Sequence, residues 1–191
     1  RVNTVVYKGV QVKDIIFDAF LRDGKISISR LNVDKLAGLS MKVSGSIASL
    51  GGVPEFSKVR FISTINDLSK LLGLFKLNTP IDARRLGLFT LDGRIDGSAI
   101  NPLVSFKLRG IGGSIQADGK LSFLPVVEKF KGNLKVVHSD LLQALESFGI
   151  KTTSSKSLGG LNLDSTVKIN KSRLIFDNIE SQIGPVSVDG S

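Results

Sequence analysis

The stretch Gly24-Lys-Ile-Ser-Ile-Ser-Arg30 places Ile26 and Ile28 at alternate positions, with Lys and Ser between them. Successive side chains of a β-strand point to opposite faces of the sheet, so this alternation predicts a strand with one buried face. The same pattern recurs in residues 39–47, 104–109 and 161–169. The sequence therefore predicts a mainly β protein whose sheet has one apolar face.

Asp-Gly pairs supply turn chemistry to this sheet. Asp23-Gly24, Asp92-Gly93 and Asp118-Gly119, with Asn170-Lys-Ser172, have the composition of turns between or within the strands, because Asp, Asn and Gly tolerate positive φ. The stretch Gly110-Ile-Gly-Gly113 is followed by further alternation rather than by a helix, so it predicts a hairpin bend and not a phosphate-binding loop. Short bends of this kind favour a meandering antiparallel sheet.

Two segments depart from the period of two. Leu, Ala and Phe recur at helical spacing in residues 68–75 and 141–148, and each stretch follows an aspartate, Asp67 or Asp140. An aspartate at this position can cap the free N–H groups of a helix start, and Gly149 is a natural end for the second helix. The sequence therefore predicts two short α-helices.

The two helices occupy equivalent places in an internal repeat. Residues 112–121 resemble residues 38–47 at a shift of 74 positions, residues 139–141 resemble 66–68 at a shift of 73, and residues 186–191 form a further partial copy. These matches predict a single array over residues 1–191, with units at roughly 8–78, 79–152 and 153–191, the last one partial. Each unit is expected to contain three strands and a short helix.

The array is expected to be a fragment of a longer chain. A repeat array that stops within a unit leaves an open sheet edge, which natural sheets usually cover. We therefore expect neighbouring repeats or another chain to pair with this terminal edge.

Composition excludes several classes of chemistry. The chain has 191 residues, no Cys and one His, so disulfides, Cys-zinc sites, thiol catalysis and paired-His metal sites are all excluded. His138 precedes Ser139 and Asp140, but adjacency in sequence does not supply the converging geometry of a catalytic triad. We expect no catalytic residue, metal or cofactor, with a hydrolase that uses His138 as an alternative.

The basic excess is dispersed along the chain. Lys and Arg number 26 against 17 Asp and Glu, which gives a net charge of +9. The basic residues alternate with Ser and Asp on the polar faces of the predicted strands, as on ordinary solvated sheets. We therefore expect no nucleic-acid partner, whereas an anionic lipid surface is an open alternative.

The apolar face is the candidate functional surface. Because most one-sided sheets pack against another layer, the residues alone favour a closed sandwich core. The alternative is an incompletely closed sheet whose inner face is a trough for acyl chains. The candidate lipid-binding residues are Ile26, Ile28, Met41, Val43, Ile47, Phe61, Phe106, Leu108, Ile115, Leu121, Phe123, Leu134, Val136, Val167 and Ile169.

The repeated motifs resemble a known family. A Gly-led strand that ends in Gly-Ser-Ile (38–47) or Gly-Lys-Leu (112–121) is followed by another strand and then by Asp-Leu-x-x-Leu-Leu (67–72) or Asp-Leu-Leu-x-x-Leu (140–145). Leu158-Gly-Gly-Leu-Asn-Leu163 and a strand pair come next. Over roughly residues 8–191 this order resembles the AsmA-like proteins of Gram-negative bacteria.

The resemblance implies a fold and a function. AsmA-like proteins are built from repeated β-units folded into a curved, taco-like sheet, and they have no catalytic residues to transfer to this sequence. Their implied role is to carry phospholipid between the inner and outer membranes, and so to maintain the outer membrane. The resemblance thus implies a periplasmic chain, held to the inner membrane by an anchor outside this fragment. The alternative is a structural or interaction scaffold with a closed, dry core.

Overall fold

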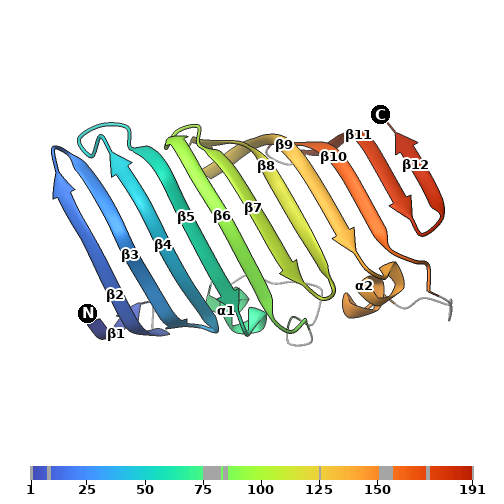
Figure 1. Cartoon of the computed structure of the whole chain (residues 1–191), viewed down its shortest axis with the longest axis horizontal. Helices are drawn as coiled ribbons and strands as arrows, with labels where there is room; N and C mark the ends of the chain where they lie inside the picture. The colour runs from blue at the N-terminus through green and yellow to red at the C-terminus, as the bar shows by residue number, and fades with distance from the viewer. Residues whose placement is uncertain are drawn as a thin grey trace.

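A computed structural model describes residues 2–7, 10–74, 83, 86–124, 126–150, 157–170 and 173–190. Twelve strands form one sheet in which each strand pairs with the next along the chain (Figure 1). The elements are β1 (Val2–Tyr7), β2 (Val10–Arg22), β3 (Lys25–Leu36), β4 (Leu39–Ala48), β5 (Glu55–Ile65), α1 (Leu68–Leu74), β6 (Phe89–Ser98), β7 (Leu103–Gly110), β8 (Gly113–Leu124), β9 (Val126–His138), α2 (Leu141–Ser147), β10 (Leu161–Asn170), β11 (Arg173–Ile183) and β12 (Val186–Gly190).

Tight turns connect antiparallel neighbours, as the sequence predicts. Asp23 and Gly24 both have positive φ, 49° and 69°, and they join β2 to β3. Ile111 and Gly112, at 53° and 74°, join β7 to β8, so the Gly-rich stretch is a hairpin bend. Two consecutive residues with positive φ match the right-handed twist of the strands they connect. The mainly β class and the antiparallel meander are confirmed.

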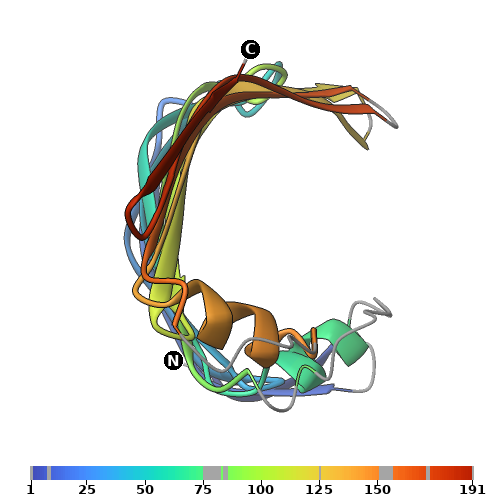
Figure 2. The same cartoon turned by 90° about the vertical axis from the view of Figure 1, so that its right-hand side faces the viewer.

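The sheet curves so strongly that the molecule has a C-shaped cross-section (Figure 2). Irregularities interrupt the pairing of several neighbouring strands, including β2 with β3, β4 with β5, and β10 with β11. Lys58 and Asn178 lie near such shifts and have positive φ, 51° and 52°. An extra residue in one strand bends it and increases its twist, so these bulges account for the curvature of strands this long.

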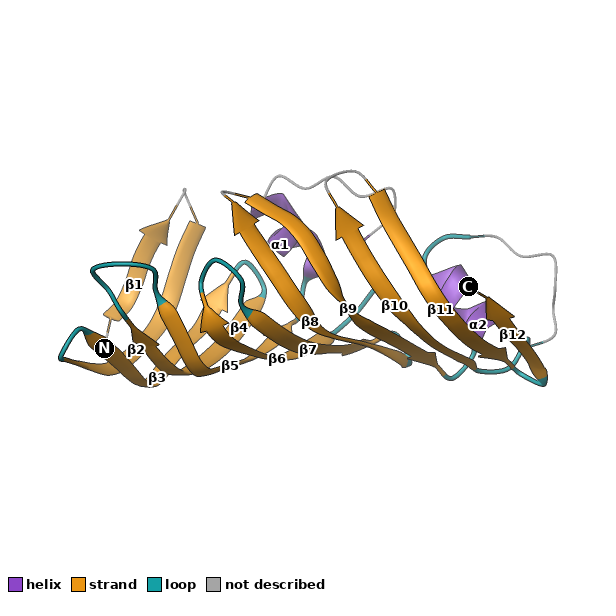
Figure 3. Ribbon diagram, turned by 90° about the horizontal axis from the view of Figure 1, so that it is seen from above, coloured by secondary structure: helices purple, strands orange, loops and turns teal. Residues whose placement is uncertain are grey.

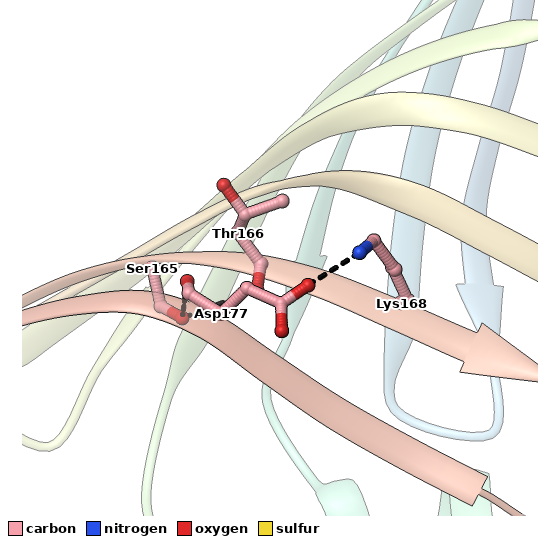
Figure 4. A network of polar contacts seen from close by, with 4 residues as sticks. All are labelled: Ser165, Thr166, Lys168 and Asp177. Carbon is pink, nitrogen blue, oxygen red and sulfur yellow. Dashed lines mark hydrogen bonds and ion pairs between the residues drawn. The ribbon is translucent and has the colours of Figure 1, made fainter. Parts of the chain in front are cut away.

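Side chains hold the irregularity between β10 and β11 (Figure 4). The Ser165 hydroxyl donates to the backbone carbonyl of Asp177 at 3.0 Å. The Lys168 ammonium pairs with the Asp177 carboxylate. The hydroxyl thus supplies the Asp177 carbonyl with a hydrogen bond at a point where the ladder is disrupted.

Both helices lie on the concave side of the sheet (Figure 2), at separate places along the row of strands (Figure 3). Beneath α1, Ile65 of β5 and Phe89 of β6 form a buried cluster with Ala83 and Leu86, and Leu68, Leu71 and Leu72 pack against it. The predicted helices are therefore confirmed, except that Phe75 lies outside the described residues. In the described part of the chain no helix has the length and apolar character needed to cross a membrane.

The repeat contains more strands than the sequence predicts. Four strands, β6 to β9, lie between α1 and α2, and four strands, β2 to β5, also precede α1. The prediction of three strands for each helix is therefore wrong. The missed strands β2 and β6 are irregular: Asp14 of β2 has a φ of 55°, and β6 carries a glycine at one of its apolar positions. Both features interrupt the alternation from which strands are recognised.

Two Asp-Gly pairs are not turns. Asp92-Gly93 lies inside β6, and Asp118-Gly119 lies inside β8. A side chain at Gly93 would overlap the ring of Phe61 on the neighbouring strand β5. One at Gly119 would overlap the backbone of Lys131 and Gly132 on β9, and the Phe130 ring as well. Glycine is needed at these positions because a ring or the adjacent backbone occupies the space that a side chain would take.

The closed sandwich favoured by the residues alone does not form. The described strands make one layer, and β1 and β12 are the ends of the strand order rather than partners. A second buried cluster, Ala117, Phe130 and Val167, lies within this single layer. The curved, open sheet is therefore the architecture of the chain.

Candidate functional site

The pairing register decides which side chains face the concave side. Ile65 and Phe89 contact α1, which lies inside the curve, so both of these side chains face the concave side. Ile65 is opposite both Phe89 on β6 and Leu39 on β4. Since directly opposite residues share a face and alternate residues of a strand do too, the concave positions can be followed from strand to strand.

Every predicted lipid-binding residue whose side chain is described lies at a concave position. The register joins neighbouring members directly, as in the pairs Val43–Phe61 and Ile115–Val136. Phe123 lies in β8, but its side chain is outside the described ones. The concave set is Ile26, Ile28, Met41, Val43, Ile47, Phe61, Phe106, Leu108, Ile115, Leu121, Leu134, Val136, Val167 and Ile169.

This concave floor is only partly covered. Val167 is buried, whereas most of the set is half-buried and Ile115 and Ile169 are 39% and 41% exposed. Phe17 of β2 and Leu174 of β11, which the register places on the same face, are more exposed still. The structure therefore leaves a continuous apolar surface open along the inside of the curve.

Among the described side chains that the pairing register places at concave positions of β4 to β10, none is charged. The polar residues there are Ser63, Ser165 and His138, and all three are buried. Isolated apolar side chains on a surface are ordinary, but a contiguous apolar surface usually marks a binding site. The concave floor, defined by the set above, is therefore the candidate functional site.

Two aromatic rings fill the space above glycines on this floor. Atoms of the Phe61 ring lie over Gly93 and atoms of the Phe89 ring lie over Gly110, in each case where a side chain on the glycine would be. Such contact covers backbone that a glycine would otherwise leave exposed. The two pairs therefore add to the apolar character of the floor.

A deeper apolar pocket of about 220 Å³ opens between the floor and α2. Ile115 and Val136 line its floor side, and Leu141, Leu145 and Phe148 line its helix side. An apolar cavity of about 150 Å³ is large enough to bind benzene, so a pocket of this size can accept part of an acyl chain. Predicted floor residues and the predicted helix thus meet at one place.

His138 is engaged in local hydrogen bonds at the end of β9. Its Nδ1 accepts from the Asp140 backbone N–H at 3.0 Å, and its Nε2 donates to the Ile111 carbonyl. The Ser139 hydroxyl donates to the Gly112 carbonyl at 3.2 Å instead of to the ring. The imidazole therefore joins the β7–β8 turn to the start of α2, and the three residues of the hydrolase alternative do not converge as a triad.

The helix starts beside the trough are held by aspartates. Asp140 accepts from the backbone N–H groups of Leu142 and Gln143, and its other oxygen accepts from the Ser157 hydroxyl at 2.9 Å. The Ser157 hydroxyl is the main cause that lowers the pKa of Asp140.

Asp67 caps α1 in the same way and binds both Ser69 and Lys70. The Ser69 hydroxyl is the main cause that lowers the pKa of Asp67 well below its usual range. Charged caps at both helix starts agree with the sequence prediction.

Sequence reasoning missed part of this site. Phe89 and Ile111 line the pocket but are not among the predicted lipid-binding residues, because alternation does not mark β6 as a strand and Ile111 lies in a turn. The apolar spacing of α2 already indicated that its leucines face the sheet. Among the described residues, no three His, Cys, Asp or Glu side chains gather in a way that could hold a metal ion.

No family model, curated protein or solved structure matches this chain. The functional proposal therefore rests on the residues and their geometry.

Proposed function

We propose that this chain is a non-enzymatic segment of an envelope-biogenesis protein, which shields phospholipid acyl chains along its concave floor. One observation carries the proposal: apolar positions form a continuous surface across β4 to β10, with no charged side chain among the described ones, and that surface is open rather than packed against a second layer. Acyl chains would lie along the floor, while headgroups stay in water near the rim.

The length of the floor suits lipid in transit. Neighbouring strands are spaced by roughly 4.8 Å, so twelve strands extend roughly 50 Å along the trough. One acyl chain spans about half of a bilayer core that is ~30 Å thick. The floor is thus longer than a single chain, and across β4 to β10 a lipid would meet no charged side chain among those that the structure describes.

The expected affinity is moderate and not specific for one lipid. Each methylene fully removed from water is worth about 0.8 kcal/mol, and a chain lying on an open floor gains roughly half of that. Such binding depends on the length of the chain and not on headgroup contacts. This suits a conduit, in which each lipid must leave as readily as it enters.

The resemblance to AsmA-like proteins supplies the cellular setting of the proposal. In that setting the chain lies in the periplasm, is tied to the inner membrane, and carries phospholipid between the inner and outer membranes. The curved sheet and the helices beside its concave face are what such a role requires.

Four exposed apolar side chains allow a matched test. Ile115 and Ile169 face the trough at 39% and 41% exposure, whereas Leu103 and Ile175 face the opposite side at 59% and 43%. We expect protein purified from membrane-expressed material to carry stoichiometric phospholipid, as measured by lipid mass spectrometry. The I115D/I169D variant should lose most of this lipid, and the L103D/I175D variant should keep it.

Two outcomes would contradict the proposal. Repeated absence of phospholipid from the unaltered protein would favour the structural scaffold, in which the floor is covered by another part of the protein or by a partner. Equal lipid loss in both double variants would show that the bound lipid is not held by the concave floor. Circular dichroism of each variant checks that the sheet is intact.

A further inference from the structure

The convex face carries a basic hollow that the trough does not use. Arg60, Arg94, Lys107 and Arg109 line a hollow of about 420 Å³, together with the single carboxylate Asp92. These side chains alternate along β5, β6 and β7 with residues that face the concave side, so they project from the opposite face. We call these five residues the basic hollow.

Carboxylates do not neutralise this hollow. In the described part of the chain, no ion pair within 4.0 Å engages Arg60, Lys107, Arg109 or Asp92. Arg94 has one partner, Asp96, at the 4.0 Å limit, and this carboxylate also accepts from the Lys58 backbone N–H at 2.6 Å. Four cations against one lining carboxylate leave a strong local excess of positive charge.

The excess continues into an adjoining hollow of about 530 Å³ that shares Arg60 and Ile62 with the first. Arg30 and Lys42 add two cations there, and no carboxylate lines it. Elsewhere on the convex face some cations have partners, as in the Lys135–Asp164 pair at 3.0 Å. Others, such as Lys120 and Lys131 on β8 and β9, form no ion pair among the described residues, so what distinguishes the basic hollow is that three arginines and a lysine line one concavity.

The arrangement also carries a cost in stability. Arg60 and Arg94 are directly opposite each other on neighbouring strands. Like charges in directly opposite positions destabilise a sheet. An anion bound between the two guanidinium groups would offset this repulsion.

We propose that the basic hollow binds a phosphate-type oxyanion, as a phosphate ester of a lipid headgroup or as a free phosphoanion. Three guanidinium groups offer paired N–H donors that fit the oxygens of a phosphate, and Lys107 adds a point charge. Ser105 and Gln116 line the same hollow and supply neutral hydrogen-bonding groups. The site lies on the face opposite the trough, so it does not depend on the proposed lipid conduit.

The test uses two probes and two matched variants of the whole chain. Inorganic pyrophosphate is titrated calorimetrically, and phosphatidylcholine vesicles with and without phosphatidylglycerol are assayed by co-sedimentation. The R60Q/R94Q variant removes two opposite cations inside the hollow. The K120Q/K131Q variant removes two opposite cations from the convex face of β8 and β9, outside the hollow.

We expect R60Q/R94Q to weaken binding of the effective probe about tenfold or more, and K120Q/K131Q to weaken it less than about threefold. Binding should also fall in high salt, which screens exposed charges. Binding to the phosphatidylglycerol vesicles alone identifies a headgroup at a membrane surface as the source, and binding to pyrophosphate identifies a free phosphoanion.

Any one of three results would overturn the proposal: that neither probe binds the unaltered protein, that both variants lose affinity equally, or that R60Q/R94Q binds as tightly as the unaltered protein. Denaturant unfolding guards against misfolding, because removal of the opposed cations should leave R60Q/R94Q at least as stable as the original chain.

Discussion

The concave and convex faces of this sheet are made by the same strands, yet they differ in chemistry. Ile169 on the concave face and Ile175 on the convex face have nearly equal exposure, 41% and 43%. Ile169 continues an apolar floor, whereas Ile175 is opposite Lys168, which forms an ion pair with Asp177. A single apolar side chain among charges is ordinary surface, but a run of them across many strands is a binding surface.

The difference teaches how much of the concave face serves folding. Buried clusters form where α1 covers β5 and β6, and around Phe130 in the middle of the sheet. Between and beyond them, partly exposed side chains such as Ile115 and Met41 gain only part of the free energy that full burial would give. A sheet selected only for stability would cover these side chains, so their exposure is the structural feature that requires a function.

The largest expected effect compares a buried concave position with its convex neighbour. Ala117 is 3% exposed in the Phe130 cluster, and Gln116 precedes it on the convex face. Ala117→Asp places an unpaired charge among apolar side chains and should lower the free energy of unfolding by about 3 kcal/mol or more. Gln116→Asp loses the hydrogen bond from Gln116 Nε2 to Asp118 at 3.0 Å but lies opposite Lys107 and Lys135, so it should lower the free energy of unfolding by no more than about 1 kcal/mol.

Denaturant unfolding of both variants measures this difference. Comparable stability for Ala117→Asp and Gln116→Asp would mean that water reaches the floor beneath Phe130. The contrast between the two faces would then be one of composition only, without a buried layer.

The alternation of side chains made the two faces predictable, because it follows directly from strand geometry. The alternation predicts that Val43, Phe61 and Val136 share one surface, and the pairing register confirms this. The helices were equally accessible, since Asp67 and Asp140 each precede a helically spaced apolar run.

Other features could not be obtained from the pattern. Asp92-Gly93 has the composition of a turn, and only the ring of Phe61 on the neighbouring strand explains why glycine lies within β6. Similarly, local alternation is the same for a closed sandwich and for an open trough. Curvature and bulge placement decide between the two, and they depend on register shifts between strands that a single sequence does not display.

A smaller effect tests the close contact between the Phe61 ring and Gly93 on the floor. Gly93→Ala would push a methyl group into the Phe61 ring and should cost about 1–3 kcal/mol in stability. Gly52 has open space around it and no positive φ, so Gly52→Ala is the matched control and should cost nothing. Denaturant midpoints measure both changes.

A double-mutant cycle assigns the cost to the ring. Phe61→Leu removes the aromatic edge, so adding Gly93→Ala in this background should cost less, with a coupling of about 0.5–3 kcal/mol. Simple additivity of the two changes would show that the ring does not lie over Gly93. It would then have to project into the trough.

The smallest expected effect concerns the rim, where α2 begins beside the concave floor. The Ser157 hydroxyl and the helix N–H groups lower the folded-state pKa of Asp140 below the ordinary value of 3.8. A group with a lowered folded-state pKa contributes stability that is complete above 3.8 and is lost as the pH falls through the folded-state value. Asp140→Asn keeps a capping oxygen but does not titrate, so its stability deficit relative to the original chain should shrink as the pH falls from 6 toward 2.5.

Ser157→Ala removes the main cause of the lowered pKa of Asp140, so the acid-induced loss of stability should begin at a higher pH. Thermal unfolding across this range measures all three proteins. Parallel pH profiles for the original chain and Asp140→Asn would show that the carboxylate is not what fixes α2 over the apolar pocket, and Ser157 would then have no part in shaping the trough.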